Sequence, residues 1–388
     1  MNFISVYLST CQLYSSIIKT ILSHPNLGES ILALIHGGQL QLVAKQFNIT
    51  PENWLDLSTG IAPLNYPIPE IPEESFKALP QSSNGLETAA KHYYDANSLL
   101  VTNGSQAIIK LLPTLWREQN PHSTTVYLPE QGYKEHALAW EMAGFTLCWY
   151  QDALPALTKI SDHCVLVIIN PNNPTGQLYC QSMLISYQEK LAKCSGLFVI
   201  DEAFIDVIKP SQSMTNTVNN YKNTLILRSF GKFFGLAGIR IGFLIAENNW
   251  CTKFKEHLGP WQVNGPAQFI AQKALADKHW QEQQQRKLKA LSVSLRAILA
   301  ENLPLEYITT ISGTALFQSV YFKKGIDVES YSVALCQQGV YVRLTDDKQA
   351  LRFGLAKDEQ LERLANALAY VTNTTINELS DKCPSAIY

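Results

Sequence analysis

The stretch "LRSFGKFFGLAGIRIG" (227–242) places one lysine among aromatic rings and glycines. Lys232 is surrounded by three phenylalanines, and Arg240 follows it by eight residues. Burying a lysine is costly unless the amine is paired or loses its charge. In an apolar pocket the pKa of a lysine is lowered, so the free amine can act as a nucleophile toward an aldehyde. Taken alone, however, the stretch fits an ordinary surface lysine better.

A second stretch, "VTNGSQAIIK" (101–110), follows an apolar, strand-like run. Ligands bind beyond the carboxyl ends of strands in open α/β sheets. Here a turn at Gly104 leads into a helix that begins at Ser105 and Gln106. The exposed N–H groups of a helix start can bind an anion such as phosphate. A plain N-cap serine is the alternative.

Two further loops offer an amide and a carboxylate. In "IINPNNPTG" (168–176) the prolines and the glycine fix a turn that could hold Asn173 over the sheet edge, or that is only structural. In "FVIDEAFIDV" (198–207) Asp201 follows an apolar strand. A poorly solvated acid needs a base, a metal or a protonated heterocycle as its partner. A helix cap explains Asp201 equally well when it is taken alone.

The bulk composition favours small-molecule chemistry. The chain has 388 residues, of which 46% are hydrophobic and 16% charged, and its formal net charge is −2. These values are typical of a globular protein with two or three domains, or one large and one small.

The sequence has no basic stripe that would predict nucleic-acid binding, and it has no polybasic patch that would predict membrane binding. Residues 1–35 lack a cationic start and are interrupted by Pro25, so we expect a packing arm rather than a signal peptide or a spanning helix.

The eight cysteines are scattered, without a CxxC pair or a zinc-type spacing. This pattern predicts buried thiols in a reducing, cytoplasmic compartment, and no metal site.

Strand-like and helix-like segments alternate from about residue 98. Helices are expected at 105–117 and 181–194, and the expected strands are 125–129, 164–170, 197–201, 224–230 and 241–246. Several of these strands are continuous apolar runs, which is typical of a parallel sheet covered on both faces. The alternation predicts an α/β sandwich.

Beyond residue 268 the pattern changes to a smaller α+β domain. We expect one long polar helix at 271–302, followed by strands at 314–321, 340–344 and 350–355. The predicted division is an N-terminal arm (1–35), a segment that packs on the small domain and the active site (36–74), a large domain (75–265) and a small C-terminal domain (266–388).

The four stretches "NGSQ", "NPNNPTG", "DEAF" and "SFGKFFGLAGIRIG" occur in a specific order. In this set the chain resembles the fold-type I pyridoxal-phosphate enzymes of the class I/II aminotransferase superfamily, from about residue 36 onward. The resemblance implies a three-layer αβα sandwich with a mostly parallel central sheet. It also implies pyridoxal 5'-phosphate as cofactor and a homodimer with active sites at the subunit interface.

The resemblance gives each motif residue a role. It implies that Lys232 forms the Schiff base with the cofactor, that Asp201 pairs with the pyridinium nitrogen and that Asn173 binds the ring 3-oxygen. Tyr133, in "LPEQGYKEH", corresponds to the aromatic residue that stacks on the ring. The expected seat of the cofactor phosphate is formed by Gly104, Ser105, Gln106, Ser229 and Arg240.

One residue departs from the pattern. Aminotransferases of this group usually carry a tyrosine three residues after the aspartate, and this chain has Phe204 there. The missing hydroxyl argues against a standard transaminase.

The stretch "HGGQLQLVAKQFNITPENWLDLSTGIAP" (36–63) resembles the start of the threonine-phosphate decarboxylases of cobalamin biosynthesis. The resemblance implies that His36, Gly60 and Ile61 lie beside the substrate. Without it, His36 would more readily be a capping or packing histidine. The resemblance further implies decarboxylation of L-threonine O-3-phosphate to (R)-1-aminopropan-2-ol phosphate.

A phosphorylated amino acid has two anionic ends, so its site needs fixed cations. The stretch "GVYVRLTDDKQALRFGLA" (339–356) supplies Arg343 for the substrate phosphate and Arg352 for the carboxylate. The opposite assignment of the two arginines stays open, and surface ion pairs are the alternative.

Two other functions remain open. Histidinol-phosphate aminotransferase is the alternative enzyme, since it also binds a phosphorylated amine. A binding or regulatory module of the same fold is the alternative without catalysis, although residues 1–35 are too short and too weakly basic for a DNA-binding segment.

Overall fold

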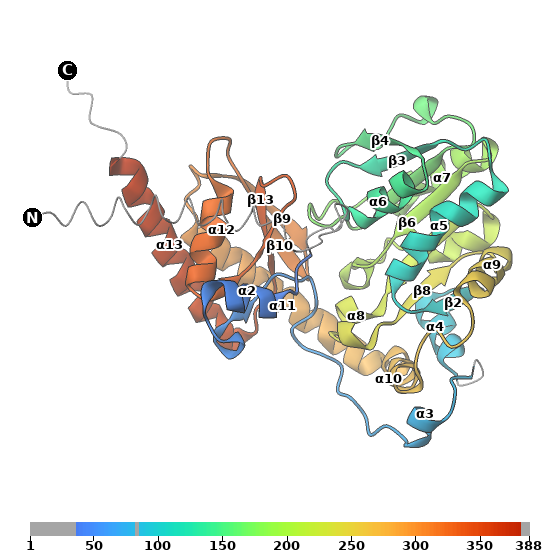
Figure 1. Cartoon of the computed structure of the whole chain (residues 1–388), viewed down its shortest axis with the longest axis horizontal. Coiled ribbons are helices and arrows are strands. Elements are labelled where there is room, and N and C mark those ends of the chain that lie inside the picture. The colour runs from blue at the N-terminus through green and yellow to red at the C-terminus, as the bar shows by residue number, and fades with distance from the viewer. Residues whose placement is uncertain (1–35, 82–84, 382–388) are drawn as a thin grey trace, which may run out of the picture. The chain divides into compact units, whose positions relative to one another are not determined.

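The computed structural model describes residues 36–81 and 85–381, and in that part of the chain seven strands form the central sheet (Figure 1). Their order is β2-β8-β7-β6-β5-β3-β4, and β8 runs antiparallel to both of its neighbours. The strands are β2 (Leu99–Thr102), β3 (Thr125–Pro129), β4 (Thr146–Tyr150), β5 (Val165–Ile169), β6 (Leu197–Asp201), β7 (Thr224–Ser229) and β8 (Gly242–Ile245). All five expected strands of this region are present.

The apolar runs of the central strands are buried on both faces of the sheet. In β5 the side chains of Leu166 and Ile168 belong to one buried cluster, and those of Val165 and Val167 belong to another. All four are completely buried. Because successive side chains of a strand point to opposite faces, a continuous apolar run requires a covering layer on each side.

Helices supply both layers. One buried cluster contains Ile108, Trp140 and Trp250 from α5, α6 and α9, and the other contains residues of α4, α7 and α10. The helices are α4 (Leu86–Tyr94), α5 (Ser105–Gln119), α6 (Glu135–Met142), α7 (Gln181–Lys193), α8 (Phe230–Phe233), α9 (Asn248–Leu258) and α10 (Gly265–Ala276). The sequence-based prediction of an αβα sandwich with a mostly parallel sheet is confirmed.

Within the same described residues, a second sheet of four antiparallel strands has the order β12-β13-β10-β9. Its strands are β9 (Ile308–Thr314), β10 (Phe317–Phe322), β12 (Arg343–Leu344) and β13 (Ala350–Gly354). The helices that accompany it are α11 (Lys278–Asn302), α12 (Val328–Gln337) and α13 (Leu361–Asp381). With its helices, this sheet is the α+β part that the sequence predicts after residue 268. The expected strand at 314–321 is wrong in detail, because it spans the end of β9, the turn after it and most of β10.

The expected long helix at 271–302 is interrupted, so this prediction is wrong in detail. Helix α10 ends at Ala276, and α11 begins at Lys278. Asp277 stands between them, and its side chain accepts a hydrogen bond from the N–H of Trp280 at 3.0 Å. An aspartate that caps a new helix start competes with continuation of the preceding helix.

The N-terminal segment begins beside the second sheet, and its helix α3 (Glu74–Lys77) contacts α10 (Figure 1). It also contains α2 (Leu40–Phe47) and β1 (Leu55–Asp56), and β1 pairs in parallel with β11 (Val340–Tyr341). The N–H of Leu57 donates to the carbonyl of Tyr341 at 2.8 Å, and the N–H of Gly354 donates to the carbonyl of Leu57 at 2.7 Å. The predicted domain boundaries stay a prediction, and the arm at 1–35 lies outside the described residues.

The described helices include none that is both long enough and apolar enough to cross a lipid bilayer.

Helix α11 provides a test of how the second sheet is supported. Leu295 is completely buried in the core, whereas Leu305, just beyond the helix, is 76% exposed. We expect Leu295→Ala to lower the free energy of unfolding by about 2–5 kcal/mol, because it leaves a cavity. The matched change Leu305→Ala should stay within about 0.5 kcal/mol of wild type. Denaturant unfolding measures both, and equal losses would contradict the assignment of Leu295 to the core.

Candidate active site

The predicted site residues gather at one edge of the central sheet. Strands β3, β5, β6 and β7 are parallel, and β2 shares their direction because both β2 and β7 are antiparallel to β8. The carboxyl ends of these strands therefore meet at the same edge. The predicted residues that end these strands or follow their ends in the chain are Ser105, Tyr133, Asn173, Asp201 and Ser229.

Lys232 is held by aromatic packing behind it. The rings of Phe230 and Phe234 are stacked with centroids 4.3 Å apart, and Phe234 stacks in turn on Trp280 at 5.6 Å. These rings fix the backbone of α8, while Nζ of Lys232 lies over the ring of a different residue, Phe204, at 5.7 Å from its centroid. The phenylalanines next to Lys232 in sequence thus support its helix, and Phe204 provides the aromatic contact to the amine.

The environment of Lys232 disfavours its charged form. Burial is the largest cause, and the cations of Arg352 and Arg240 add to it, while Asp201 opposes them. Together they lower the pKa of Lys232 to about 8. The amine therefore loses its proton at a lower pH than an ordinary lysine does, which favours its action as a nucleophile.

Asp201 has a buried partner that sequence reasoning missed. Its Oδ2 lies 2.9 Å from Nε2 of His136, and its Oδ1 accepts the N–H of Ala203 at 3.0 Å. Both Asp201 and His136 are buried, so each satisfies a polar group that would otherwise be costly. The available signal was the dipeptide Glu135–His136 two residues after Tyr133, which puts two titratable groups at a helix start.

The two predicted arginines are neighbours on adjacent strands of the second sheet. Arg343 on β12 is directly opposite Arg352 on β13. Burial and, next, the cation of Arg343 lower the pKa of Arg352 to about 10. Like charges placed opposite each other on adjacent strands are destabilising unless an anion joins them.

Arg352 also connects the two sheets. One of its terminal nitrogens donates to Oδ1 of Asn173, and the other donates to the carbonyl of Ser58 at 2.6 Å. Its Nε is buried and has no hydrogen-bond partner among the described residues. Arg343 binds Oδ1 of Asp346 at 2.7 Å. Because a guanidinium has five N–H donors, each arginine keeps donors beyond these contacts for an incoming carboxylate or phosphate.

Two glycines allow close packing at the start of α5. A Cβ atom on Gly104 would come within 2.9 Å of the guanidinium of Arg240, and one on Gly242 would come within 2.5 Å of the backbone nitrogen of Ser105. No side chain caps the first turn of α5. Ser229 on β7 is directly opposite Gly242 on β8. The backbone N–H groups, Arg240 and the absence of Cβ atoms together suit a phosphate group.

Gln106 and His36 take part in a network that the sequence did not predict. The side-chain amide of Gln106 donates to Glu135, and its Oε1 accepts the hydroxyl of Tyr133 at 3.0 Å. Nε2 of His36 lies 2.8 Å from Oε1 of Glu135. The side chain of Gln106 is therefore engaged, which leaves its backbone N–H for the predicted phosphate seat.

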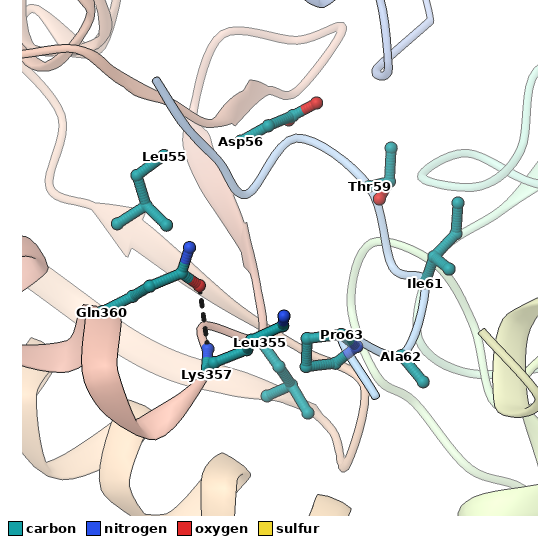
Figure 2. A pocket seen from close by; sticks show the side chains of 9 residues that line it. All are labelled: Leu55, Asp56, Thr59, Ile61, Ala62, Pro63, Leu355, Lys357 and Gln360. Atoms are coloured by element: carbon teal, nitrogen blue, oxygen red, sulfur yellow. Dashed lines mark hydrogen bonds between the residues drawn. The ribbon is translucent and has the colours of Figure 1, made fainter. Parts of the chain in front are cut away.

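Gly60 and Ile61 lie on the loop beside Phe204. A Cβ atom on Gly60 would come within 2.7 Å of the Phe204 ring, so only glycine allows this approach. Ile61 lines a cavity of about 330 Å³, and Figure 2 shows its side chain together with that of Lys357. The full lining is Leu55, Asp56, Thr59, Ile61, Ala62, Pro63, Leu355, Lys357 and Gln360. Lys232 and Asp201 do not line this cavity, so it borders the predicted site without containing its reactive amine.

The sequence profile described as aminotransferase class I and II matches residues 73–368. The chain belongs to this family. A relative named threonine-phosphate decarboxylase from Pseudomonas aeruginosa is 38% identical over 329 residues, which cover 84% of this chain and 94% of the relative. A relative with the same name from a Sinorhizobium species is 36% identical over 345 residues, covering 87% and 98%.

Among solved structures, the histidinol-phosphate aminotransferase from Clostridium acetobutylicum is similar to this chain, with a TM-score of 0.70 and 22% identity. The match covers 82% of this chain and 99% of that one. At this identity the likeness establishes the shared fold.

The lowered pKa of Lys232 gives a direct test in the ligand-free protein. We expect chemical labelling of its amine to rise with pH around a midpoint of about 8. Arg352→Gln removes a cation that disfavours the charged amine, so the midpoint should move to higher pH. The exposed Arg286→Gln on α11 is the control and should leave the midpoint unchanged. Peptide mass spectrometry after pulse labelling measures the curve, and a wild-type midpoint near 10.4, the ordinary value for lysine, would contradict the account.

Proposed function

We propose that the chain is a pyridoxal-phosphate-dependent decarboxylase of L-threonine O-3-phosphate. The observation that carries the proposal is the pair Arg343 and Arg352, opposed on adjacent strands, with Arg352 bonded to Asn173 and close enough to Lys232 to lower the pKa of the amine. Two fixed cations suit a substrate with both a carboxylate and a phosphate. The relatives at 36–38% identity, both named threonine-phosphate decarboxylase, support the same substrate.

The residues at the sheet edge fit pyridoxal phosphate. Lys232 offers an amine of lowered pKa, and Asp201 is a buried carboxylate whose orientation is fixed by His136. Gly104 and Gly242 leave room beside the start of α5, where Arg240 supplies a cation. We propose that Lys232 holds the cofactor covalently and that Ser105, Gln106, Ser229 and Arg240 bind its phosphate. Asp201, Asn173 and Tyr133 would bind its ring.

When bound, pyridoxal phosphate supplies an electron-accepting ring that stabilises negative charge at the substrate's α-carbon. The chain decides which bond at that carbon breaks, because its residues fix the orientation of the substrate. Arg352 and Arg343 would grip the carboxylate and the phosphate, while His36, Gly60 and Ile61 would border the substrate. Held at both ends, the substrate can present its carboxylate for loss as CO2.

Lys232 is suited to the proton transfer that completes the reaction. Loss of CO2 leaves the α-carbon one proton short of the product, (R)-1-aminopropan-2-ol phosphate. Because the pKa of Lys232 is about 8, its Nζ can hold a proton and release it near neutral pH. We propose that Nζ delivers this proton to the α-carbon.

The proposal includes a homodimer and a place in cobalamin biosynthesis. Both come from the resemblance of the sequence to this group of decarboxylases. The product is an amino alcohol phosphate, which a later reaction would consume as a building block.

Histidinol-phosphate aminotransferase is the alternative function, and Phe204 distinguishes it. The ring of Phe204 faces Nζ of Lys232 and offers no hydroxyl. The rings of Phe204 and Phe317 pack edge to face with centroids 5.2 Å apart, so this position has an apolar neighbour. The missing hydroxyl argues against a standard transaminase, because aminotransferases of the resembling group usually carry a tyrosine at this position.

The reaction can be tested with purified protein and added pyridoxal phosphate. With L-threonine O-3-phosphate we expect release of CO2, and Lys232→Ala should reduce it to background. With histidinol phosphate and 2-oxoglutarate we expect no glutamate. Glutamate formation without CO2 release from threonine phosphate would refute the decarboxylase and support the alternative.

The roles of the two arginines can be separated by kinetics. Arg343→Gln removes a charge-assisted hydrogen bond, so we expect the KM for threonine phosphate to rise about 10- to 100-fold. Asp346→Asn is the matched control, because it removes only the resting partner of Arg343, and its KM should not rise. If Arg343→Gln leaves KM unchanged while Arg352→Gln abolishes the preference for threonine phosphate over threonine, the assignment of the phosphate to Arg343 is wrong.

A further inference from the structure

Glu135 joins parts of the chain that lie far apart in sequence. It is the first residue of α6, and its side chain is only 12% exposed. One carboxylate oxygen lies 2.8 Å from Nε2 of His36, and the other accepts a hydrogen bond from the amide of Gln106. A buried carboxylate beside a predicted anion seat is unfavourable unless strong partners hold it, and these two residues provide them.

The network continues to Tyr133. The hydroxyl of Tyr133 donates to Oε1 of Gln106 at 3.0 Å, and the ring of His36 packs near its ring with centroids 5.9 Å apart. Burial and, next, the carboxylate of Glu135 raise the pKa of Tyr133 well above its ordinary value. The tyrosine therefore keeps its proton as the donor to Gln106, and Glu135 acts on it through Gln106 and through His36.

The contact between His36 and Glu135 also positions the beginning of the N-terminal segment. Two residues after His36, the N–H of Gly38 donates to Oγ of Ser58 at 2.8 Å. The carbonyl of Ser58 accepts from Arg352. The contact between His36 and Glu135 thus lies at the start of a chain of contacts that ends at a proposed substrate cation. His36 itself keeps a side-chain exposure of 42%, so part of its ring remains accessible to a ligand.

The helix dipole alone does not explain Glu135. An acidic residue in the first turn of a helix is favourable, and an exposed carboxylate would serve that purpose. Here the side chain is buried, and its partners lie 99 and 29 residues away in the sequence. This placement indicates a tertiary role.

We propose that Glu135 is a positioning residue: its carboxylate holds His36 and Gln106 in place, and so keeps the N-terminal segment and Tyr133 ordered at the substrate side of the site. The effect on catalysis rests on the proposed function, whereas the effect on the segment does not.

The structural part is tested by hydrogen–deuterium exchange of the ligand-free full chain. We expect Glu135→Ala to speed exchange at Gly37 and Gly38, which follow the released His36. Glu141→Ala is the matched control, since Glu141 lies on the same helix and is exposed. Faster exchange confined to α6, with Gly37 and Gly38 unchanged, would overturn the proposal and leave Glu135 a helix-stabilising residue.

The functional part is tested by a double-mutant cycle with His36. We expect Glu135→Ala to raise the KM for threonine phosphate about tenfold and to change kcat less. Glu135→Gln should recover part of the loss, because it keeps one of the two acceptor oxygens. If Glu135 acts through His36, the double variant with His36→Ala should have nearly the KM of His36→Ala alone. Additive losses, or a KM that Glu135→Ala leaves unchanged, would overturn the proposal.

The two tests separate the two proposals. If the wild-type chain releases no CO2 from threonine phosphate, the proposed function fails, and the exchange experiment still decides whether Glu135 holds His36.

Discussion

A lysine amine buried close to two arginines is the constraint on which the site depends. Lys232 loses solvation and is repelled by Arg352 and Arg240, while the nearby carboxylate of Asp201 only partly compensates. Asp201 is itself engaged with His136. The excess of positive charge can be relieved if Lys232 gives up its proton and if anions bind the arginines. Both outcomes would serve the proposed function, in which the chain holds a phosphorylated aldehyde and a substrate with two anionic groups.

The fold places these groups together because backbone segments approach each other closely at the sheet edge. Parallel strands bring their carboxyl ends to one edge, and glycines at 104 and 242 let the start of α5 and the strand β8 come together there. The stacked rings of Phe230 and Phe234 fix α8 from behind. The polar groups lie at the ends of the strands, and the aromatic core supports the helix of Lys232. The second sheet contributes Arg352, which contacts Asn173.

The sequence predicted the features that depend on local pattern. Continuous apolar runs such as 197–201 imply buried parallel strands, and Asp201 is recognisable because it ends one of them. Partnerships over long distances were not predictable in this way: the dipeptide Glu135–His136 marks two titratable groups, but nothing local marks Asp201, 65 residues away, as the partner of His136. The break at Asp277 was missed because the polar helical pattern continues through it. Strand β4 was missed because four of its five residues are only partly buried or exposed at the sheet edge, which weakens the apolar signal.

The central claim is that the amine of Lys232 is the group that captures pyridoxal phosphate at this sheet edge. Incubation of the full chain with the cofactor, reduction with borohydride and peptide mass spectrometry test it directly, since reduction makes a covalent link permanent. The account predicts one modified peptide, the one that contains Lys232. In the Lys232→Ala variant the corresponding peptide should carry no modification. Modification at another lysine, or none at Lys232 under saturating cofactor, would contradict it.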